Sequence, residues 1–325
     1  MSEVVEGFGA EQRERVKALL KAKQFFWVDV SSSTTSPGDV AEALDIPDRL
    51  LSFGDAHPSA RKFVADGERV AFGISCYLES GQTQAGAAYR LHPVEVGVVV
   101  TGDYLLTMHQ DRLSLPQALE PYMPEGRSEQ YAVYAVLDAI VASAFDALGE
   151  VEETLDRLAV SSADLRAGRP RMATLRETSM RLSDLRRKAA PLRGLFERIG
   201  VEITRVKGLE ADDEDYFERI SNQIHRLVDA IDAAADAMAT LIDLRLNETS
   251  YWLTVVATIF LPLTFITGFF GMNFGWMVDH VDTAPAFWLL GVGSLLVGVG
   301  LIWSLIVRGS PVQGGDDPAG AGPHG

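Results

Sequence analysis

The residues best suited to act on an ion follow one face of an uncharged segment near the C-terminus. Between Glu248 and Asp279 the sequence contains no Asp, Glu, Lys or Arg. Within this segment, mostly small or polar residues recur at intervals of three and four, which places them on one narrow face of a helix. These residues are Ser250, Thr254, Ala257, Leu261, Thr264, Gly268 and Gly271, with Asn247 one turn earlier. Such a face can line a polar path, or it can serve ordinary small-residue helix packing.

Two uncharged segments follow each other at this end of the chain. The second lies between Asp282 and Arg308, and each exceeds the roughly 20 residues that a helix needs to cross a bilayer. We therefore expect a transmembrane hairpin over 249–308, with spans at about 250–271 and 284–307. A pair of buried core helices is the alternative. The two segments also explain a mean hydropathy of +0.08 in a chain with 23% charged residues.

Basic residues suggest the orientation of this hairpin. Arg245 precedes the first span and Arg308 follows the second, whereas the joining loop carries only Asp279 and Asp282. The positive-inside rule then predicts a multi-pass protein of the plasma (inner) membrane with both termini in the cytoplasm. The N-terminal sequence has no apolar region of a signal peptide, so we expect residues 1–248 to be cytoplasmic.

Composition limits what the cytoplasmic part can do. The 325 residues include 29 Lys and Arg against 45 Asp and Glu, a formal net charge of −16, which argues against nucleic acid as a partner. The single cysteine, Cys76, excludes an internal disulfide or a multi-Cys zinc site. Length and pattern predict an α+β cytoplasmic domain over 1–125, long helices over 126–248, the two-helix hairpin, and a flexible cytoplasmic tail over 309–325.

Finer patterns predict individual elements. Helices are expected over 11–23 and 129–165, with another running to about Ile199, and strands over 25–30, 69–77, 94–101 and 104–109. A last long helix carries an apolar heptad and contains no Gly or Pro between Glu210 and Leu261, so we expect it to continue into the first span. The heptad residues are Phe217, Ile220, Ile224, Leu227, Ile231, Ala234, Met238 and Leu241. This apolar stripe is offset by two positions from the polar one, which leaves open which side of the helix faces an axis.

Two helices cannot enclose a polar path through lipid by themselves. The hairpin is therefore either a plain anchor or one of several copies around a common axis. An enzyme is not indicated, because the sequence has no phosphate-binding loop, no Gly-x-Ser-x-Gly motif and no His-Glu-x-x-His motif, and its six histidines are scattered.

The first span ends in a recognisable motif. Gly268-Phe269-Phe270-Gly271-Met272-Asn273-Phe274 follows the uninterrupted apolar segment that contains Pro262. This resembles the CorA family of magnesium transporters, whose signature is a Gly-Met-Asn triplet at the end of the first of two C-terminal spans. The resemblance includes the strand Trp27-Val28-Asp29-Val30, the pair His57-Pro58 and the order of an α/β part before long helices, so it extends over most of the chain.

The resemblance implies a funnel-shaped homopentamer whose first span lines a pore. Gly271, Met272 and Asn273 would form the external selectivity filter, and Asp279 and Asp282 would attract cations to its mouth. The positions that match pore-lining residues of the family are Asn247, Leu253, Ala257, Leu261, Thr264 and Gly268. The family is regulated by Mg²⁺ bound between cytoplasmic domains, for which Asp212 and Asp236 are candidate ligands. No cofactor beyond the transported and regulatory ion is implied.

The chemistry of these residues fits a hydrated cation. Mg²⁺ dehydrates reluctantly, and a ring of carbonyls and Asn273 amides can hydrogen-bond its water shell without removing it. The implied function is channel-like uptake of Mg²⁺, with Co²⁺ or Ni²⁺ as further ions, driven by the membrane potential and gated by cytoplasmic Mg²⁺. One alternative is a zinc transporter of the related proton-coupled branch. Another is a membrane-anchored scaffold without transport.

Overall fold

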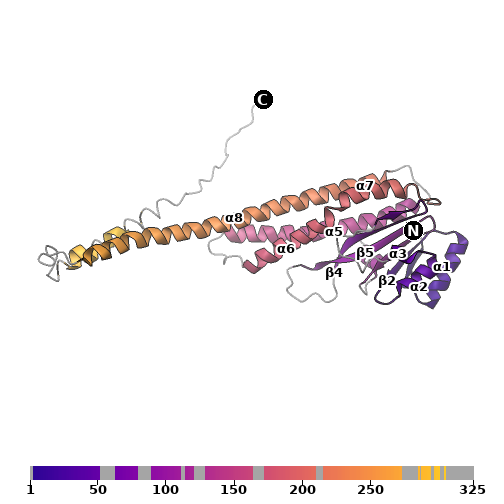
Figure 1. Cartoon of the computed structure of the whole chain (residues 1–325), viewed down its shortest axis with the longest axis horizontal. Helices are drawn as coiled ribbons and strands as arrows, with labels where there is room; N and C mark the ends of the chain where they lie inside the picture. The colour runs from indigo at the N-terminus through magenta and orange to yellow at the C-terminus, as the bar shows by residue number, and fades with distance from the viewer. Residues whose placement is uncertain are drawn as a thin grey trace, which may run out of the picture. The chain divides into compact units, whose positions relative to one another are not determined.

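The protein is described by a computed structural model that forms two compact units, Met1–Leu241 and Ile242–Gly325. Figure 1 shows the elements along the chain. The structure describes residues 3–51, 63–79, 89–110, 114–120, 129–163, 172–209, 215–272, 287–293 and 296–300, together with positions 285 and 304. His57, Pro58 and the predicted tail over 309–325 lie outside these residues.

A mixed sheet of six strands organises the first unit. In spatial order the strands are β1 (Glu3–Glu6), β2 (Phe26–Ser31), β6 (Tyr104–His109), β5 (Leu91–Thr101), β4 (Arg69–Glu79) and β3 (Val64–Ala65). The three strands β1, β2 and β6 run parallel, whereas β5 pairs antiparallel with β6 and β4, and β4 pairs antiparallel with β3. Strand β2 lies inside the sheet, with Phe26 aligned to Tyr104 and Ser31 to His109.

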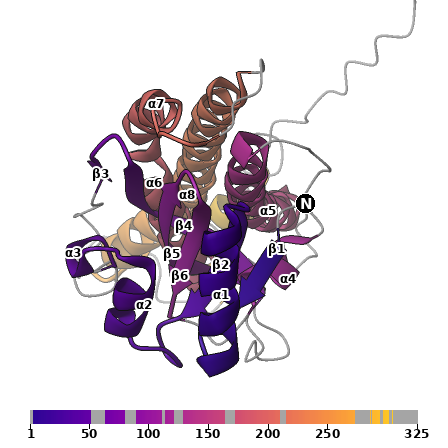
Figure 2. The same ribbon diagram turned by 90° about the vertical axis from the view of Figure 1, so that its right-hand side faces the viewer.

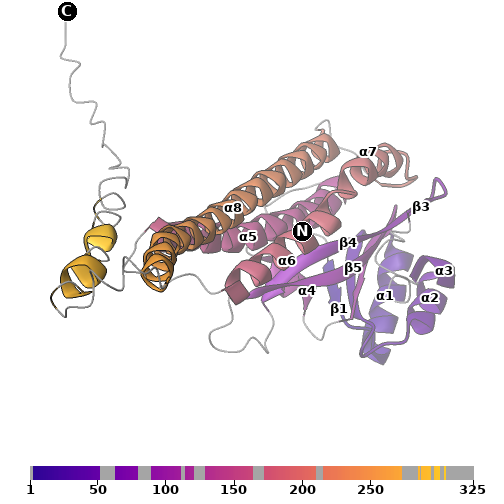
Figure 3. The same ribbon diagram turned by 60° about the vertical axis from the view of Figure 1, so that its left-hand side comes forward.

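Helices cover both faces of the sheet (Figures 2 and 3). One face carries α1 (Ala10–Ala22), α2 (Pro37–Leu44) and α3 (Asp48–Leu51), and the other carries α4 (Leu115–Leu119), α5 (Glu129–Ala163), α6 (Met172–Ala189), α7 (Leu192–Ile203) and the first part of α8 (Tyr216–Phe270). Because successive side chains of a strand point to opposite faces, Trp27 packs on the α5 side, and Phe26 and Val28 pack on the α1 side.

Strand β4 is tied directly to α5. The Tyr77 backbone N–H donates to Ser143 Oγ over 3.0 Å, and Cys76 Sγ lies 3.4 Å from the same oxygen. Burial raises the pKa of the Cys76 thiol to about 12, although the hydrogen bond between Cys76 and Ser143 acts in the opposite direction. The contact between β4 and α5 is therefore dry and closely packed.

A backbone contact joins the β5–β6 hairpin to the segment between α7 and α8. A Cβ atom placed on Gly102 would lie 2.2 Å from the Lys207 carbonyl oxygen and 3.0 Å from Gly208 Cα. Gly208 itself has a φ of +86°, in the region that favours glycine. Only glycine fits at position 102, so this turn fixes the chain just ahead of α8.

Most of the predicted elements are confirmed, with one error. The structure contains α1, β2, β4, β5, β6 and α5 close to their predicted bounds, and α8 continues through the uncharged segment as expected. The helix predicted to run to about Ile199 is instead two helices, α6 and α7, which meet at Pro191. Proline has no backbone N–H, and its ring collides with the carbonyl four residues earlier, which explains the break. Strands β1 and β3 and helices α3 and α4 were not predicted.

Two helices are long and apolar enough to cross a membrane by length and composition. They are Glu129–Val160 within α5 and Tyr216–Phe269 within α8. Of the predicted second span over 284–307, the structure describes a π-helical turn, η2 (Phe287–Val292), and helical residues at 296–300. Its other positions lie largely outside the described residues.

Candidate functional site

The residues predicted to line a path all lie on one exposed face of α8. None of them is covered by the described part of the chain. Leu261 is 76% exposed and Leu253 is 71% exposed, although both are large and apolar. The full set is Asn247, Leu253, Ala257, Leu261, Thr264 and Gly268.

The opposite face of this segment is half-buried. Its residues are Val255, Ile259, Pro262, Leu263 and Ile266. A Cβ atom placed on Gly298 would lie 3.7 Å from Ile266 Cδ1, so the second apolar segment contacts this face. At about 100° per residue, the half-buried face and the exposed face point roughly 170° apart. The second unit therefore covers one side of its helix and leaves the other side open.

The exposed face continues with the same spacing toward the N-terminal end of α8. Steps of seven residues back from Ser250 reach Asp243, Asp236 and Asp229. We call this face the polar stripe. Its earlier members, all exposed, are Asn222, Arg226, Asp229, Ala233, Asp236, Thr240 and Asp243.

The predicted apolar heptad of α8 lies on the other side and is buried by the protein's own first unit. Its residues from Phe217 to Met238 belong to the main core, and Leu241 is packed against that core. The side that remains exposed along the helix is therefore the polar stripe. The first unit thus covers the apolar side of α8, and which side faces an axis stays a prediction.

Hydroxyl groups on the uncharged part of α8 are oriented by their own helix. Thr254 Oγ1 donates to the Ser250 carbonyl over 2.9 Å, and Thr264 Oγ1 donates to the Phe260 carbonyl over 2.8 Å. A hydroxyl oxygen whose hydrogen is already donated can only accept a further hydrogen bond. The polar stripe therefore offers acceptors, which suit a positively charged ion surrounded by water.

Helix α8 ends at the predicted selectivity triplet. The Gly271 N–H donates to the Thr267 carbonyl over 3.0 Å, and the Met272 N–H donates to the Phe269 carbonyl over 3.3 Å. Met272 is partly exposed. Asn273, Asp279 and Asp282 lie outside the described residues.

Acidic residues near the polar stripe differ in their pairing. Asp229 forms an ion pair with Arg193, and Asp232 pairs with Arg186 over 2.8 Å. Asp236, one of the two predicted regulatory ligands, is exposed and pairs with none of the described residues. The other, Asp212, lies outside them. Within the described ranges, no group of three or more His, Cys, Asp or Glu side chains is placed to hold a metal ion.

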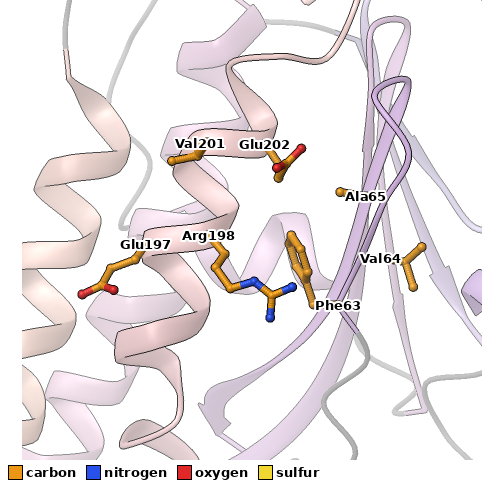
Figure 4. A pocket seen from close by; sticks show the side chains of 7 residues that line it. All are labelled: Phe63, Val64, Ala65, Glu197, Arg198, Val201 and Glu202. Carbon is orange, nitrogen blue, oxygen red and sulfur yellow. The ribbon is translucent and has the colours of Figure 1, made fainter.

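A separate groove of about 560 Å³ lies between β3 and α7 (Figure 4). Its lining residues are Phe63, Val64, Ala65, Glu197, Arg198, Val201 and Glu202. The Arg198 guanidinium lies over the Phe63 ring, 4.5 Å from its centre. No residue predicted from the sequence to act on an ion lines this groove.

The sequence model of the family described as CorA-like Mg2+ transporter protein matches residues 22–308, which is most of the chain. The chain belongs to this family. The family resemblance inferred from the sequence is thereby confirmed, whereas the role of the Gly-Met-Asn triplet in this chain stays a prediction.

Curated relatives of the CorA-family chain include transporters of different metals. It is 29% identical to the cobalt/magnesium transport protein CorA of Thermotoga maritima, over 46% of this chain and 44% of the relative. It is 29% identical to the divalent cation transporter CmaX of Pseudomonas aeruginosa, over 50% and 47%. It is 32% identical to the zinc transport protein ZntB of Yersinia enterocolitica, over 35% and 36%. The chain thus spans about half the length, or less, of these curated relatives.

Solved structures support the same CorA fold over a longer part of the chain. The CorA magnesium transporter from Methanocaldococcus jannaschii superimposes with a TM-score of 0.55 at 18% identity, covering 87% of this chain and 90% of that one. The full-length CmaX protein gives a TM-score of 0.54 at 19% identity, covering 87% of each chain. At these identities the likeness shows the fold alone.

The sequence of this CorA-family chain predicted the stripe members from Asn247 to Gly271. It did not predict that the stripe continues back to Asn222. Asp229, Asp236 and Asp243 repeat at the seven-residue spacing of Ser250, Ala257 and Thr264. Extending that spacing toward the N-terminus was the signal that could have found them. The apolar heptad, which predicts the buried side, occupies the other side of the same helix.

Proposed function

We propose that this chain is a subunit of a homopentameric divalent-cation channel in which the polar stripe of α8 faces the central path. The observation that carries this proposal is the polar stripe itself, which is exposed from Asn222 to Gly271 while the opposite face of the helix is buried or half-buried. An exposed polar face within an apolar helix is unfavourable in lipid. Copies arranged around an axis would remove that face from lipid.

The ion would move as a hydrated species along successive acceptors. Thr254 and Thr264 would accept hydrogen bonds from its water shell, because their own hydrogens are held by the helix. Asp243 and Asp236 would attract cations on the cytoplasmic side. Gly271, Met272 and Asn273 would form the external filter, with Asp279 and Asp282 near its mouth. Leu253 and Leu261 would close the path by excluding water.

The membrane potential can drive this movement without a nucleotide. Two charges that cross 100 mV gain about 4.6 kcal/mol. Mg²⁺ is the ion we propose first, with Co²⁺ and Ni²⁺ as further substrates. Regulation by cytoplasmic Mg²⁺ at Asp212 and Asp236 stays a prediction, as do the inner-membrane location and the cytoplasmic termini.

The decisive test is flux through the purified protein. Wild type and Asn273→Ala are reconstituted into liposomes, and uptake of Mg²⁺, Co²⁺, Ni²⁺ and Zn²⁺ is compared under an inside-negative potential. We expect Asn273→Ala to abolish uptake and to leave the oligomer intact by native mass spectrometry. Undiminished flux in this variant would refute the filter assignment. Absence of flux for all four ions in the wild type would favour the anchored scaffold.

A zinc transporter is the second candidate function. It is favoured by the 32% identity to zinc transport protein ZntB of Yersinia enterocolitica. Zn²⁺ uptake that requires a proton gradient, without Mg²⁺ uptake under a membrane potential, would support this candidate over the first.

A further inference from the structure

One residue on the apolar side of α8 is exposed, whereas its neighbours on that side are half-buried. The apolar heptad continues from Leu241 through Arg245, Glu248, Trp252, Val255, Ile259, Pro262 and Ile266, and all of these positions except one are half-buried. The exception is Trp252, which is 52% exposed. It follows the part of α8 that the first unit covers and precedes the part that the second apolar segment contacts. The largest side chain on this face is thus left uncovered by the described chain.

Tyr251 lies beside Trp252 and is exposed to the same extent. It is 51% exposed, and the two rings meet edge to face with their centres 6.0 Å apart. At about 100° per residue, Tyr251 points about 110° and Trp252 about 150° away from the mean direction of the stripe members from Ser250 to Gly271. If the polar stripe faces a central path, Tyr251 and Trp252 therefore lie on the outward half of the helix.

Tyr251 and Trp252 also lie where the sequence of α8 changes from charged to uncharged. Arg245 and Glu248 form an ion pair of 3.6 Å within the two turns before them, and no charged residue follows until Asp279. The helix from Trp252 to Gly271 would measure about 28 Å at 1.5 Å per residue, close to the ~30 Å of a hydrocarbon core. Tyr and Trp combine an apolar ring with one polar atom, and they concentrate at membrane interfaces for that reason.

We propose that Tyr251 and Trp252 form an anchor in the lipid headgroup boundary on the cytoplasmic side, which fixes the depth of α8 in the bilayer. This inference rests on the proposed function, because it assumes that α8 crosses the membrane. The anchor places Asn247 in water at the inner mouth and brings Gly271 to the outer boundary. The partner is the bilayer surface, where the polar atom of each side chain contacts water and its ring is buried among the lipids.

The position of Trp252 can be measured directly. The full chain is reconstituted in bilayers whose lipids carry bromine either near the glycerol end or near the methyl end of the acyl chain. The fluorescence emission of Trp252 is obtained by subtracting the emission of the Trp252→Phe variant from that of wild type. We expect this difference to be quenched preferentially by the shallow bromine. Preferential quenching by the deep bromine would overturn the anchor, and absence of quenching would overturn it in favour of coverage by a second copy.

A second measurement tests whether the pair sets the depth. A Val256→Cys variant carries a fluorophore, while Cys76 stays unlabelled because its thiol is buried. We expect Tyr251→Ala with Trp252→Ala to make this label more accessible to aqueous iodide, whereas the matched control Phe265→Ala, an exposed aromatic without a polar tip, leaves it unchanged. Equal accessibility in both backgrounds would overturn the anchor alone. A label that lipid-borne quenchers never reach would instead refute the membrane span, and with it the proposed function.

Discussion

Helices α5 and α8 are alike in composition and opposite in surroundings. Each contains a stretch that is long and apolar enough to cross a bilayer, yet 67% of that stretch is buried inside the protein in α5 and 0% in α8. The first unit covers α5 with its sheet and with helices that include α4 and α6, whereas the uncharged part of α8 has only a partial cover on one side. Apolar composition therefore indicates that a helix is buried away from water. The rest of the chain determines whether a protein core or a membrane surrounds it.

The same substitution should fail differently in the two helices. Ile140 of α5 is fully buried, so Ile140→Asp places an unpaired carboxylate in the core and should cost more than about 4 kcal/mol of unfolding free energy. Val256→Asp in α8 should leave the melting of the first unit unchanged and reduce membrane insertion, at a cost of about 2.5–3.5 kcal/mol. Thermal melts followed by circular dichroism, with membrane fractionation, check both. A wild-type melt for Ile140→Asp would contradict the assignment of α5 to the core.

The contact at Gly102 should be the next most sensitive point. Gly102→Ala forces a Cβ into the Lys207 carbonyl oxygen and should cost about 1–3 kcal/mol through displacement of the segment before α8. Gly149→Ala is the matched control, because its Cβ would meet nothing within 4 Å inside α5. That control should gain up to about 1 kcal/mol from helix propensity. Chemical denaturation of both variants distinguishes a steric contact from a general effect of adding a methyl group.

The dryness of the β4–α5 contact can be measured by pH. Because burial raises the pKa of the Cys76 thiol from 9.0 to about 12, the folded state binds this proton more tightly than the unfolded state. Its contribution is fully present below pH 9.0 and is lost as the pH rises toward 12, by about 1.4 kcal/mol per pH unit. Wild type should therefore lose more stability across this window than Cys76→Ala. Parallel pH profiles for the two proteins would mean that solvent reaches the thiol.

Removal of a single hydroxyl group from the polar stripe should have the smallest effect, and it should be seen in cation flux. Thr264→Val keeps the shape of the side chain and removes one acceptor, so cation flux should fall by about fivefold if the assembly as a whole loses roughly 1 kcal/mol of favourable contact. Thr267 lies off the stripe and donates to the Leu263 carbonyl over 3.0 Å, so Thr267→Val is the control. Equal flux losses in the two variants would show that the hydroxyls support the helix rather than the path.

The fold was predictable where local pattern determines it. The run of aromatic and β-branched residues in Phe26–Ser31 and the long apolar repeat of α5 each sufficed to assign an element. Strand β1 has only four residues and β3 only two, so neither carries a pattern long enough to recognise without its partner strand. The break at Pro191 was missed because the apolar spacing on its two sides favoured a single helix.

The candidate site was predictable as a spacing but not as an orientation. The sequence placed Ala257, Leu261 and Thr264 on one face, and the structure leaves that face exposed. Which side of α8 is covered depends on the sheet and the helices that pack on it, and no local pattern contains that information. The continuation through Asp236 became visible only after the buried side was known.

The seven-residue spacing of the polar stripe has a mechanical consequence. A straight α-helix drifts by about 20° per heptad relative to an exact seven-residue repeat. Between Asn222 and Gly271 the drift would reach about 140°. Copies that keep the stripe on a common axis must therefore wind around one another with a left-handed twist. Any change in that twist would rotate one end of the stripe against the other.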